Sequence, residues 1–109
     1  MKPAVFTELA LTCGSWQEAQ TIADSLLDKH LVACVEMLEV KSQYHWQGNK
    51  ERTTEVKLLM HTIMDKWEKI EAEVKRLLSH KVFNLQALPL SQMSKEAQVW
   101  LQAETKGIT

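Results

Sequence analysis

The segment from residue 31 to residue 60 constrains the fold of this chain more than any other. Two apolar runs, 31–38 and 55–60, are separated by an extended stretch and by the pair Gly48-Asn49. Strand-like segments joined through a short Gly-Asn turn are typical of a β-hairpin. We therefore predict one long hairpin arm, with a strand from Leu31 through Trp46 and a return strand from Glu51 to Thr62.

The rest of the chain predicts two further strands and three helices around this hairpin. Apolar alternation over residues 4–12 predicts the first strand, and residues 85–88, which Pro89 ends, predict the last one. Apolar residues at helical spacing predict helices over about 16–29 and 67–78, and Ser94 opens a short C-terminal helix. This order predicts an α+β, ferredoxin-like βαββαβ fold with an added C-terminal helix.

Both faces of the predicted sheet carry apolar side chains. The two long helices cover one face, and the opposite face carries Phe6, Ala10, Cys34, Leu38 and Leu59. In a monomer this second face is expected to be polar because water covers it. We therefore predict that it packs against other subunits of an oligomer, whose number the pattern does not give.

Length and charge exclude several classes of function. The 109 residues predict one domain, residues 1–109. With 13 basic and 14 acidic side chains, the formal net charge of −1 gives no general reason to bind nucleic acid or an anionic membrane. No apolar run approaches the ~20 residues that span a bilayer, and the N-terminus is too polar for a signal-peptide core. Two separated cysteines fit reduced thiols, so we expect a cytoplasmic protein.

Several short motifs resemble those of one known family. In chain order they are Thr12-Cys13, Leu31-Val32-Ala33-Cys34-Val35, Tyr44-x-Trp46-x-Gly48, Glu55 and Trp100-Leu101. They follow the order of the corresponding motifs in the CutA divalent-ion-tolerance proteins, and the similarity covers almost the whole chain. On these residues, the chain is identified as resembling that family.

The resemblance implies a ferredoxin-like subunit in a tightly packed homotrimer whose sheets face inward. It also implies a cytosolic, non-enzymatic role in tolerance of copper and other divalent ions, with copper or another divalent metal as the bound ion. The expected protein partner is therefore other copies of this chain. We assign a set of residues to the subunit interface on this basis, namely Tyr44, Trp46, Gly48, Glu55 and Trp100.

The chain departs from the family pattern at three places. Glu36 stands where the family has Asn, and His61-Thr62 where it has Lys-Thr. The family's H-P-Y-E-x-P-E segment is reduced to residues 80–86, which lack its Pro, its Tyr and both acids. A function that depends on that Tyr or those acids is in doubt here, so we interpret the chain as a divergent member.

Cys34, Glu36 and His61 form the candidate metal site. If Trp46 pairs with Glu51 across the turn, Glu36 lies opposite His61, with Cys34 on the same face at roughly 7–8 Å, one diagonal away. Sulfur with imidazole suits Cu(I) or Zn(II). Two alternatives remain open: Cys34 as a small buried hydrophobic residue, and Glu36 with His61 as a paired structural couple.

Three further residues have side chains that could form a site. His80 aligns with the family's histidine and is a fourth candidate ligand, although a His near a helix C-terminus is often only a favourable dipole partner. Cys13 precedes the first helix, where the pKa of a thiol can be lowered; with no base nearby in sequence, it reads as a passive loop residue. His30 ends the first helix and is interpreted as a capping residue.

Two other functions remain as alternatives. One is a PII-like trimer that senses a small ligand and regulates a partner protein, but PII proteins use a long flexible loop where this chain has a tight turn. The other is an enzyme that uses Cys13 or Cys34. It has the least support, because the sequence contains no evident nucleophile–base–acid set and no Gly-rich phosphate loop.

Overall fold

The elements follow the predicted order. The computed structural model describes residues 3–78 and 82–106. These contain β1 (Phe6–Cys13), α1 (Trp16–Asp28), β2 (Cys34–Trp46), β3 (Asn49–Ile63), the 3₁₀ turn η1 (Met64–Lys66), α2 (Trp67–Leu77), β4 (Leu85–Pro89) and α3 (Lys95–Glu104). The strands form one sheet in the order β2-β3-β1-β4, with all neighbours antiparallel. This topology confirms the predicted ferredoxin-like fold.

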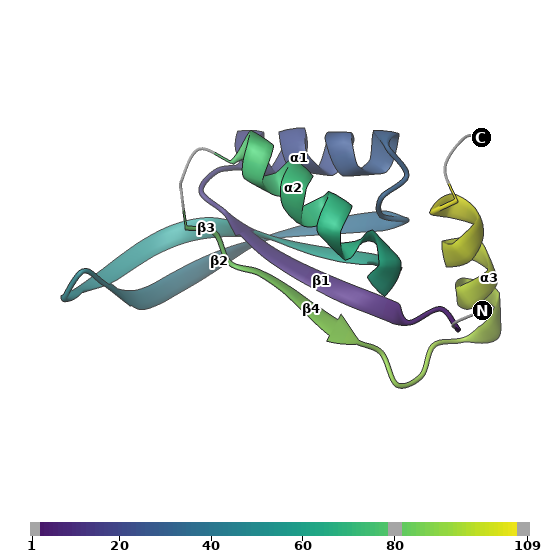
Figure 1. Cartoon of the computed structure of the whole chain (residues 1–109). Coiled ribbons are helices and arrows are strands. Elements are labelled where there is room, and N and C mark those ends of the chain that lie inside the picture. Colours follow the sequence, from purple (N-terminus) through teal and green to yellow (C-terminus); the bar gives the residue numbers. More distant parts are fainter. Residues whose placement is uncertain (1–2, 79–81, 107–109) are drawn as a thin grey trace.

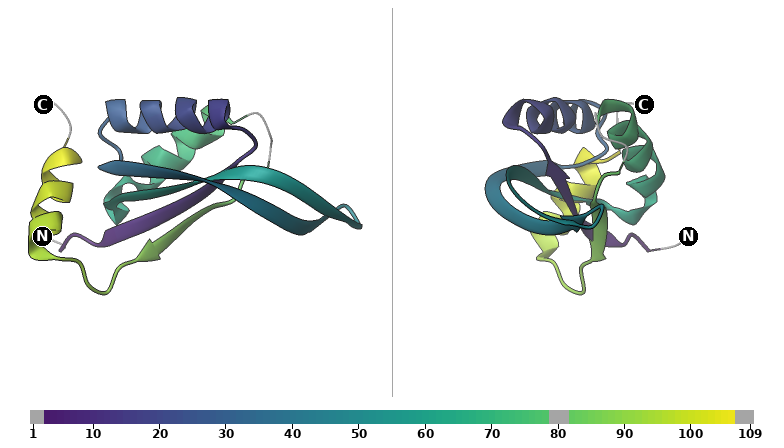
Figure 2. Two further views of the ribbon diagram at one scale, coloured as in Figure 1. Left: turned by 180° about the vertical axis from the view of Figure 1, so that it is seen from behind. Right: turned by 90° about the vertical axis from the view of Figure 1, so that its left-hand side faces the viewer.

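The molecule is built as a helical layer on one face of a sheet, with a long arm at one end. Helices α1 and α2 lie side by side on the same face of the sheet (Figures 1 and 2). The β2–β3 hairpin continues beyond them as the arm, and α3 lies at the opposite end of the sheet. The arm gives the chain an elongated shape of 47 × 28 × 22 Å.

The core lies between the helices and the covered face of the sheet. Side chains on β1 alternate between buried and partly exposed, as a strand with one covered face requires. The largest buried apolar side chains come from both layers and from α3: Leu9, Leu11, Ile22, Leu26, Leu58, Met60, Ile70, Val74 and Leu101. Burying each of these is worth about 1.5–3 kcal/mol of transfer free energy, so this layer supplies the main driving force for the fold.

The opposite face of the sheet remains partly exposed. Phe6, Ala10, Cys34 and Leu59 are neither fully buried nor fully exposed, and Leu38 is 41% exposed. Pairing across the sheet puts these residues on the face away from α1 and α2, as predicted. The face is therefore a mixed apolar surface. We call it the open face.

The turn of the arm differs from the prediction. Trp46 pairs with Asn49, not with Glu51, so the loop consists of Gln47 and Gly48 alone. Both residues have positive φ, 49° and 82°, which is the backbone of a type I′ turn and matches the twist of the flanking strands. The sequence reading placed the turn at Gly48-Asn49 and so shifted the pairing by two residues. An even shift leaves every side chain on its predicted face but changes its partner.

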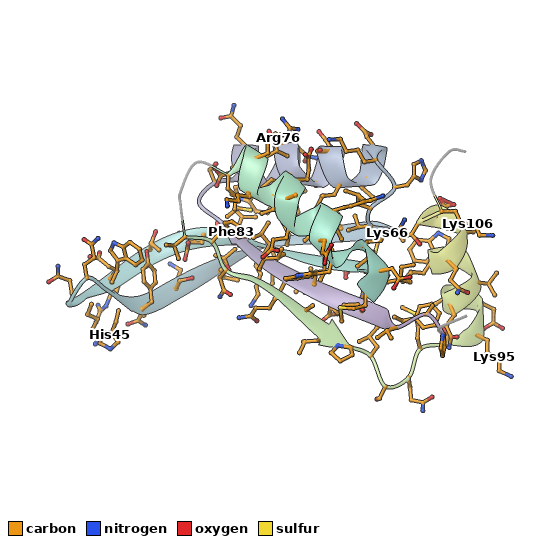
Figure 3. The ribbon with its side chains drawn as sticks, viewed as in Figure 1. His45, Lys66, Arg76, Phe83, Lys95 and Lys106 are labelled. Atoms are coloured by element: carbon orange, nitrogen blue, oxygen red, sulfur yellow. The ribbon has the colours of Figure 1, made fainter. Side chains whose placement is uncertain are left out.

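A charged cluster fastens α1 to α2. The side chain of Glu73 on α2 is only 9% exposed. It accepts hydrogen bonds from Ser25 on α1 and from Lys29, the residue after α1, the latter at 2.7 Å. Arg76, one turn further along α2, donates two more at 2.9 and 2.7 Å (Figure 3). The hydrogen bonds from Arg76, followed by those from Lys29 and Ser25, hold the pKa of Glu73 well below its usual range.

His30 fastens α3 to the end of α1. It follows α1 in the left-handed conformation, with φ of 56°, and its backbone N–H donates to the carbonyl of Leu27. Its ring nitrogen Nδ1 lies 2.8 Å from the carbonyl oxygen of Glu104 in the last turn of α3. The predicted capping residue therefore also joins two helices.

Replacement of Gly48 by Ala should destabilise the arm. A side chain at φ of 82° meets the backbone strain of the left-handed region, which costs about 1–2 kcal/mol. We expect Gly48→Ala to lower the free energy of unfolding in urea by about 1 kcal/mol. Gly14→Ala is the matched control, since a Cβ there meets nothing closer than 3.9 Å and no positive φ. Equal stability of the two variants would contradict the turn assignment.

Loss of the Glu73 carboxylate should destabilise the protein in a pH-dependent way. A depressed pKa stabilises the fold above the ordinary Glu value of about 4.3, and this contribution disappears as the pH falls toward the lower folded value. We expect Glu73→Gln to lower the melting temperature at pH 7 and the difference from the unmodified protein to shrink below about pH 4. The exposed Glu71→Gln is the control. A difference that persists unchanged at pH 3 would argue against this linkage.

Candidate functional site

Three strands bring Cys34, His61 and Glu8 into one row on the open face. Cys34 on β2 is directly opposite His61 on β3, and His61 is directly opposite Glu8 on β1. Directly opposed residues of antiparallel strands share a face with Cβ atoms about 4.5–5.5 Å apart. The row therefore follows from the pairing of β3 with both of its neighbours.

The side chains of this row are in contact. Cys34 Sγ lies 3.1 Å from His61 Nδ1, and His61 Nε2 lies 3.2 Å from Glu8 Oε1. The imidazole thus connects a thiol on one side with a carboxylate on the other. The side chains of His61 and Glu8 are 22% and 33% exposed.

The surroundings of Cys34 favour the protonated thiol in the metal-free protein. Burial raises its pKa most, and the negative charges of Glu36 and Glu8 raise it further, while a hydrogen bond with the backbone of His61 lowers it. A thiophilic metal ion binds the thiolate, so binding at Cys34 must displace this proton. The raised pKa makes the Cys34 thiol a weaker free nucleophile than an ordinary cysteine.

The observed pairing of β2 with β3 differs by two residues from the predicted one, and this changes the predicted site. Leu59, not His61, lies opposite Glu36, so the expected Glu36–His61 pair is wrong, and Glu36 is an exposed neighbour of the row. Cys34 takes the place opposite His61 that the prediction gave to Glu36. His61 and Cys34 are closer than predicted, in contact rather than one diagonal apart.

Glu8 is the residue that sequence reasoning missed. It belongs to β1, and the site was predicted from the hairpin of β2 and β3 alone. The available signal was the predicted topology, which makes β1 a neighbour of β3, together with an acidic side chain among the apolar residues of β1. The register that puts Glu8 opposite His61 could not be read from local pattern.

His80 lies outside the described residues, so its role as a ligand stays a prediction. Within residues 3–78 and 82–106, no group of three His, Cys, Asp or Glu side chains surrounds a common point. Of the predicted ligands that the structure describes, Cys34 and His61 are the two whose side chains contact each other. Glu8 lies on the far side of the imidazole ring.

Cys13 is a core residue. It is the last residue of β1, not part of a loop, and its side chain is fully buried. Burial, followed by the charges of Glu18 and Glu55, raises its pKa to about 12. The lowered pKa considered for a thiol at a helix N-terminus is therefore wrong for this chain, and Cys13 has no support as a nucleophile.

The residues assigned to the subunit interface lie mainly on the arm. Tyr44 and Trp46 are 42% and 46% exposed near its tip, Gly48 forms the turn, and Glu55 pairs with Val40 at its base. His45 also lies on the arm, away from the helices (Figure 3). Trp100, 44% exposed on α3, lies at the other end of the molecule. Their contacts with other subunits remain a prediction.

Comparison with known proteins gives consistent matches. The family described as CutA1 divalent ion tolerance protein matches residues 8–104. The divalent-cation tolerance protein CutA of Archaeoglobus fulgidus is 34% identical over 91 residues, covering 84% of this chain and 89% of that protein. The protein of the same description from Thermus thermophilus is 33% identical over 96 residues, covering 87% and 93%.

Solved structures agree with the sequence comparison. The structure described as the periplasmic divalent cation tolerance protein CutA from Archaeoglobus fulgidus superimposes with a TM-score of 0.90 at 31% identity, over 93% of this chain and 99% of that one. The divalent cation tolerance protein from Thermus thermophilus gives a TM-score of 0.89 at 32% identity, over 92% and 98%.

Thiol alkylation should distinguish a metal-site cysteine from a catalytic one. A pKa of about 12 leaves Cys13 with roughly a thousand-fold less thiolate near pH 8 than an ordinary cysteine. We expect iodoacetamide to label Cys13 at least roughly a thousand-fold more slowly in the native protein than in the urea-unfolded protein. Peptide mass spectrometry measures the labelling. Cys34 should also react more slowly than free cysteine. Labelling of either thiol faster than free cysteine would favour the enzyme alternative.

Proposed function

We propose a function that proceeds from one premise: the chain belongs to the CutA1 divalent ion tolerance protein family. On that premise, we propose that it is a homotrimeric, non-enzymatic protein, one domain over residues 1–109, that binds copper or another divalent metal ion. Through this binding it contributes to tolerance of the ion.

The contact between Cys34 and His61 is the observation that carries the metal-binding proposal. A thiolate sulfur and an imidazole nitrogen are the donors preferred by Cu(I) and Zn(II), whereas Mg²⁺ and Ca²⁺ prefer oxygen. The two donor atoms lie 3.1 Å apart on strands that the sheet holds in fixed register. The metal here is the cargo of the protein.

The open face supports the homotrimer. Leu38 and Leu88 on it are 41% and 57% exposed, and Phe6, Ala10 and Leu59 are partly exposed beside them. Exposed apolar surface of this kind is characteristic of subunit contacts. A trimer whose sheets face inward would bury it, and the aromatic side chains of the arm, Tyr44 and Trp46, would pack against a neighbouring subunit.

Three features bear on location and on the alternative function. We propose a cytoplasmic location because both cysteines are free thiols, which a reducing compartment maintains, although the solved Archaeoglobus fulgidus relative is described as periplasmic. The described residues contain no helix long and apolar enough to cross a membrane.

The two-residue turn between β2 and β3 gives no support to a PII-like sensor, which uses a long loop there.

A copper titration on protein of known mass should test the proposal. We expect the unmodified chain to sediment as a trimer and to bind copper, and Cys34→Ala and His61→Ala each to weaken binding by at least tenfold while remaining trimeric. Removal of one of two donor atoms is the physical reason. Cys13→Ala is the matched control, because it removes a thiol from the core and should leave affinity unchanged. Unchanged affinity in both site variants would overturn the site, and a monomeric protein would overturn the trimer.

A further inference from the structure

We propose that Glu8 is a positioning residue of the metal site: its hydrogen bond to His61 holds the imidazole so that Nδ1 and the sulfur of Cys34 bind one soft metal ion together. This inference rests on the proposed metal-binding function and deepens it.

The hydrogen bond to Glu8 determines which ring nitrogen is available. An ionised carboxylate accepts hydrogen bonds and donates none, so the 3.2 Å contact requires a proton on His61 Nε2. A neutral imidazole carries one proton, which leaves a lone pair on Nδ1. Nδ1 lies 3.1 Å from Cys34 Sγ, so in this tautomer the thiol is the donor of the contact. A metal ion replaces the thiol proton in this contact.

The separation of the two donors fits a bent arrangement around the ion. Zinc bonds of about 2.3 Å to sulfur and about 2.0 Å to nitrogen place the two donors about 3.5 Å apart in a tetrahedral site. The observed 3.1 Å must therefore widen by about 0.4 Å, which small side-chain rotations can supply. A linear arrangement would require about 4.3 Å from the same bond lengths. The pair is thus suited to bent coordination of Zn(II), Co(II) or Cu(I).

Glu8 orients the imidazole and does not bind the ion itself. Its carboxylate contacts Nε2, on the side of the ring opposite Nδ1, so it cannot reach an ion held between Nδ1 and sulfur. A histidine ligand whose second nitrogen donates to a carboxylate is a recurring arrangement in metal proteins, and loss of the carboxylate typically weakens metal binding 10–100-fold.

Glu36 provides a matched control for Glu8. Both are acidic residues on the open face, and both raise the pKa of the Cys34 thiol through their charge. Only Glu8 is directly opposite His61 and hydrogen-bonded to it, whereas Glu36 is opposite Leu59. A general effect of negative charge near the sulfur would be the same for both residues, while positioning of the ring requires Glu8.

The experiment uses the full chain with Co(II) as a spectroscopic probe and Cu(I) in competition with a chromophoric chelator. We expect a thiolate-to-cobalt charge-transfer band that Cys34→Ser abolishes. Glu8→Ala should weaken the binding of both ions 10–100-fold. It should also reduce the visible absorption bands of tetrahedral cobalt. Glu8→Gln should retain most of the affinity, because its amide oxygen accepts the same hydrogen bond from Nε2. Glu36→Ala should bind like the unmodified chain.

Nitrogen NMR of the metal-free protein gives a readout that does not depend on metal loading. The His61 ring should carry its proton on Nε2 in the unmodified chain and in Glu8→Gln, and its Nε2 proton should exchange faster with water in Glu8→Ala. Thermal unfolding of each variant shows whether the fold is retained.

The outcomes separate this inference from the function on which it rests. If Cys34→Ser abolishes the band but Glu8→Ala binds as tightly as the unmodified chain, the positioning role is overturned and the metal site stands. If Glu8→Ala and Glu36→Ala weaken metal binding equally, the positioning role of Glu8 is also overturned, and negative charge near the sulfur explains the effect. If the unmodified chain binds cobalt or copper with no dependence on Cys34, both the inference and the proposed site are overturned.

Discussion

The pairing of β3 with two strands at once is the constraint on which the site depends. β3 lies between β2 and β1, and its residues 56–61 each face a partner on either side. At His61 these partners are Cys34 and Glu8. The three side chains come from distant parts of the sequence, yet backbone hydrogen bonds set their spacing. Any change of register in either ladder would separate them, because the two pairings at His61 place thiol, imidazole and carboxylate side by side.

The face of each strand residue could be predicted from the sequence, but its partner could not. Alternation of apolar residues put Cys34 and His61 on the same face, and an error of two residues in the hairpin register preserved that result. The partner of His61 depended on the turn. A two-residue type I′ loop requires positive φ at Gln47 as well as at Gly48, and Gln gives little local signal for it. Glu8 depended on a long-range ladder that local pattern does not encode.

The two cysteines illustrate how position on the sheet decides the chemistry of one residue type. Cys13 and Cys34 lie on opposite faces. Cys13 is fully buried under the helices, where its pKa is raised to about 12. Cys34 lies on the open face, partly exposed and in contact with a nitrogen that can accept its proton. The sequence alone offered both as candidates, and only the alternation along each strand distinguished the core thiol from the site thiol.

The row of polar groups is compatible with an open face that other subunits would cover. A buried polar group without a partner costs free energy, so an apolar interface normally excludes thiols, imidazoles and carboxylates. Here the thiol and the carboxylate each have a partner in the imidazole, within the same chain. Among the described residues, no buried side-chain nitrogen or oxygen lacks a hydrogen bond. A second subunit could therefore pack over the thiol and the imidazole, which are already paired within the chain. Removal of bulk water there would strengthen the interaction of sulfur and nitrogen with a metal ion. The proposed oligomer and the proposed metal site rest on separate observations, and one face of the sheet can accommodate both.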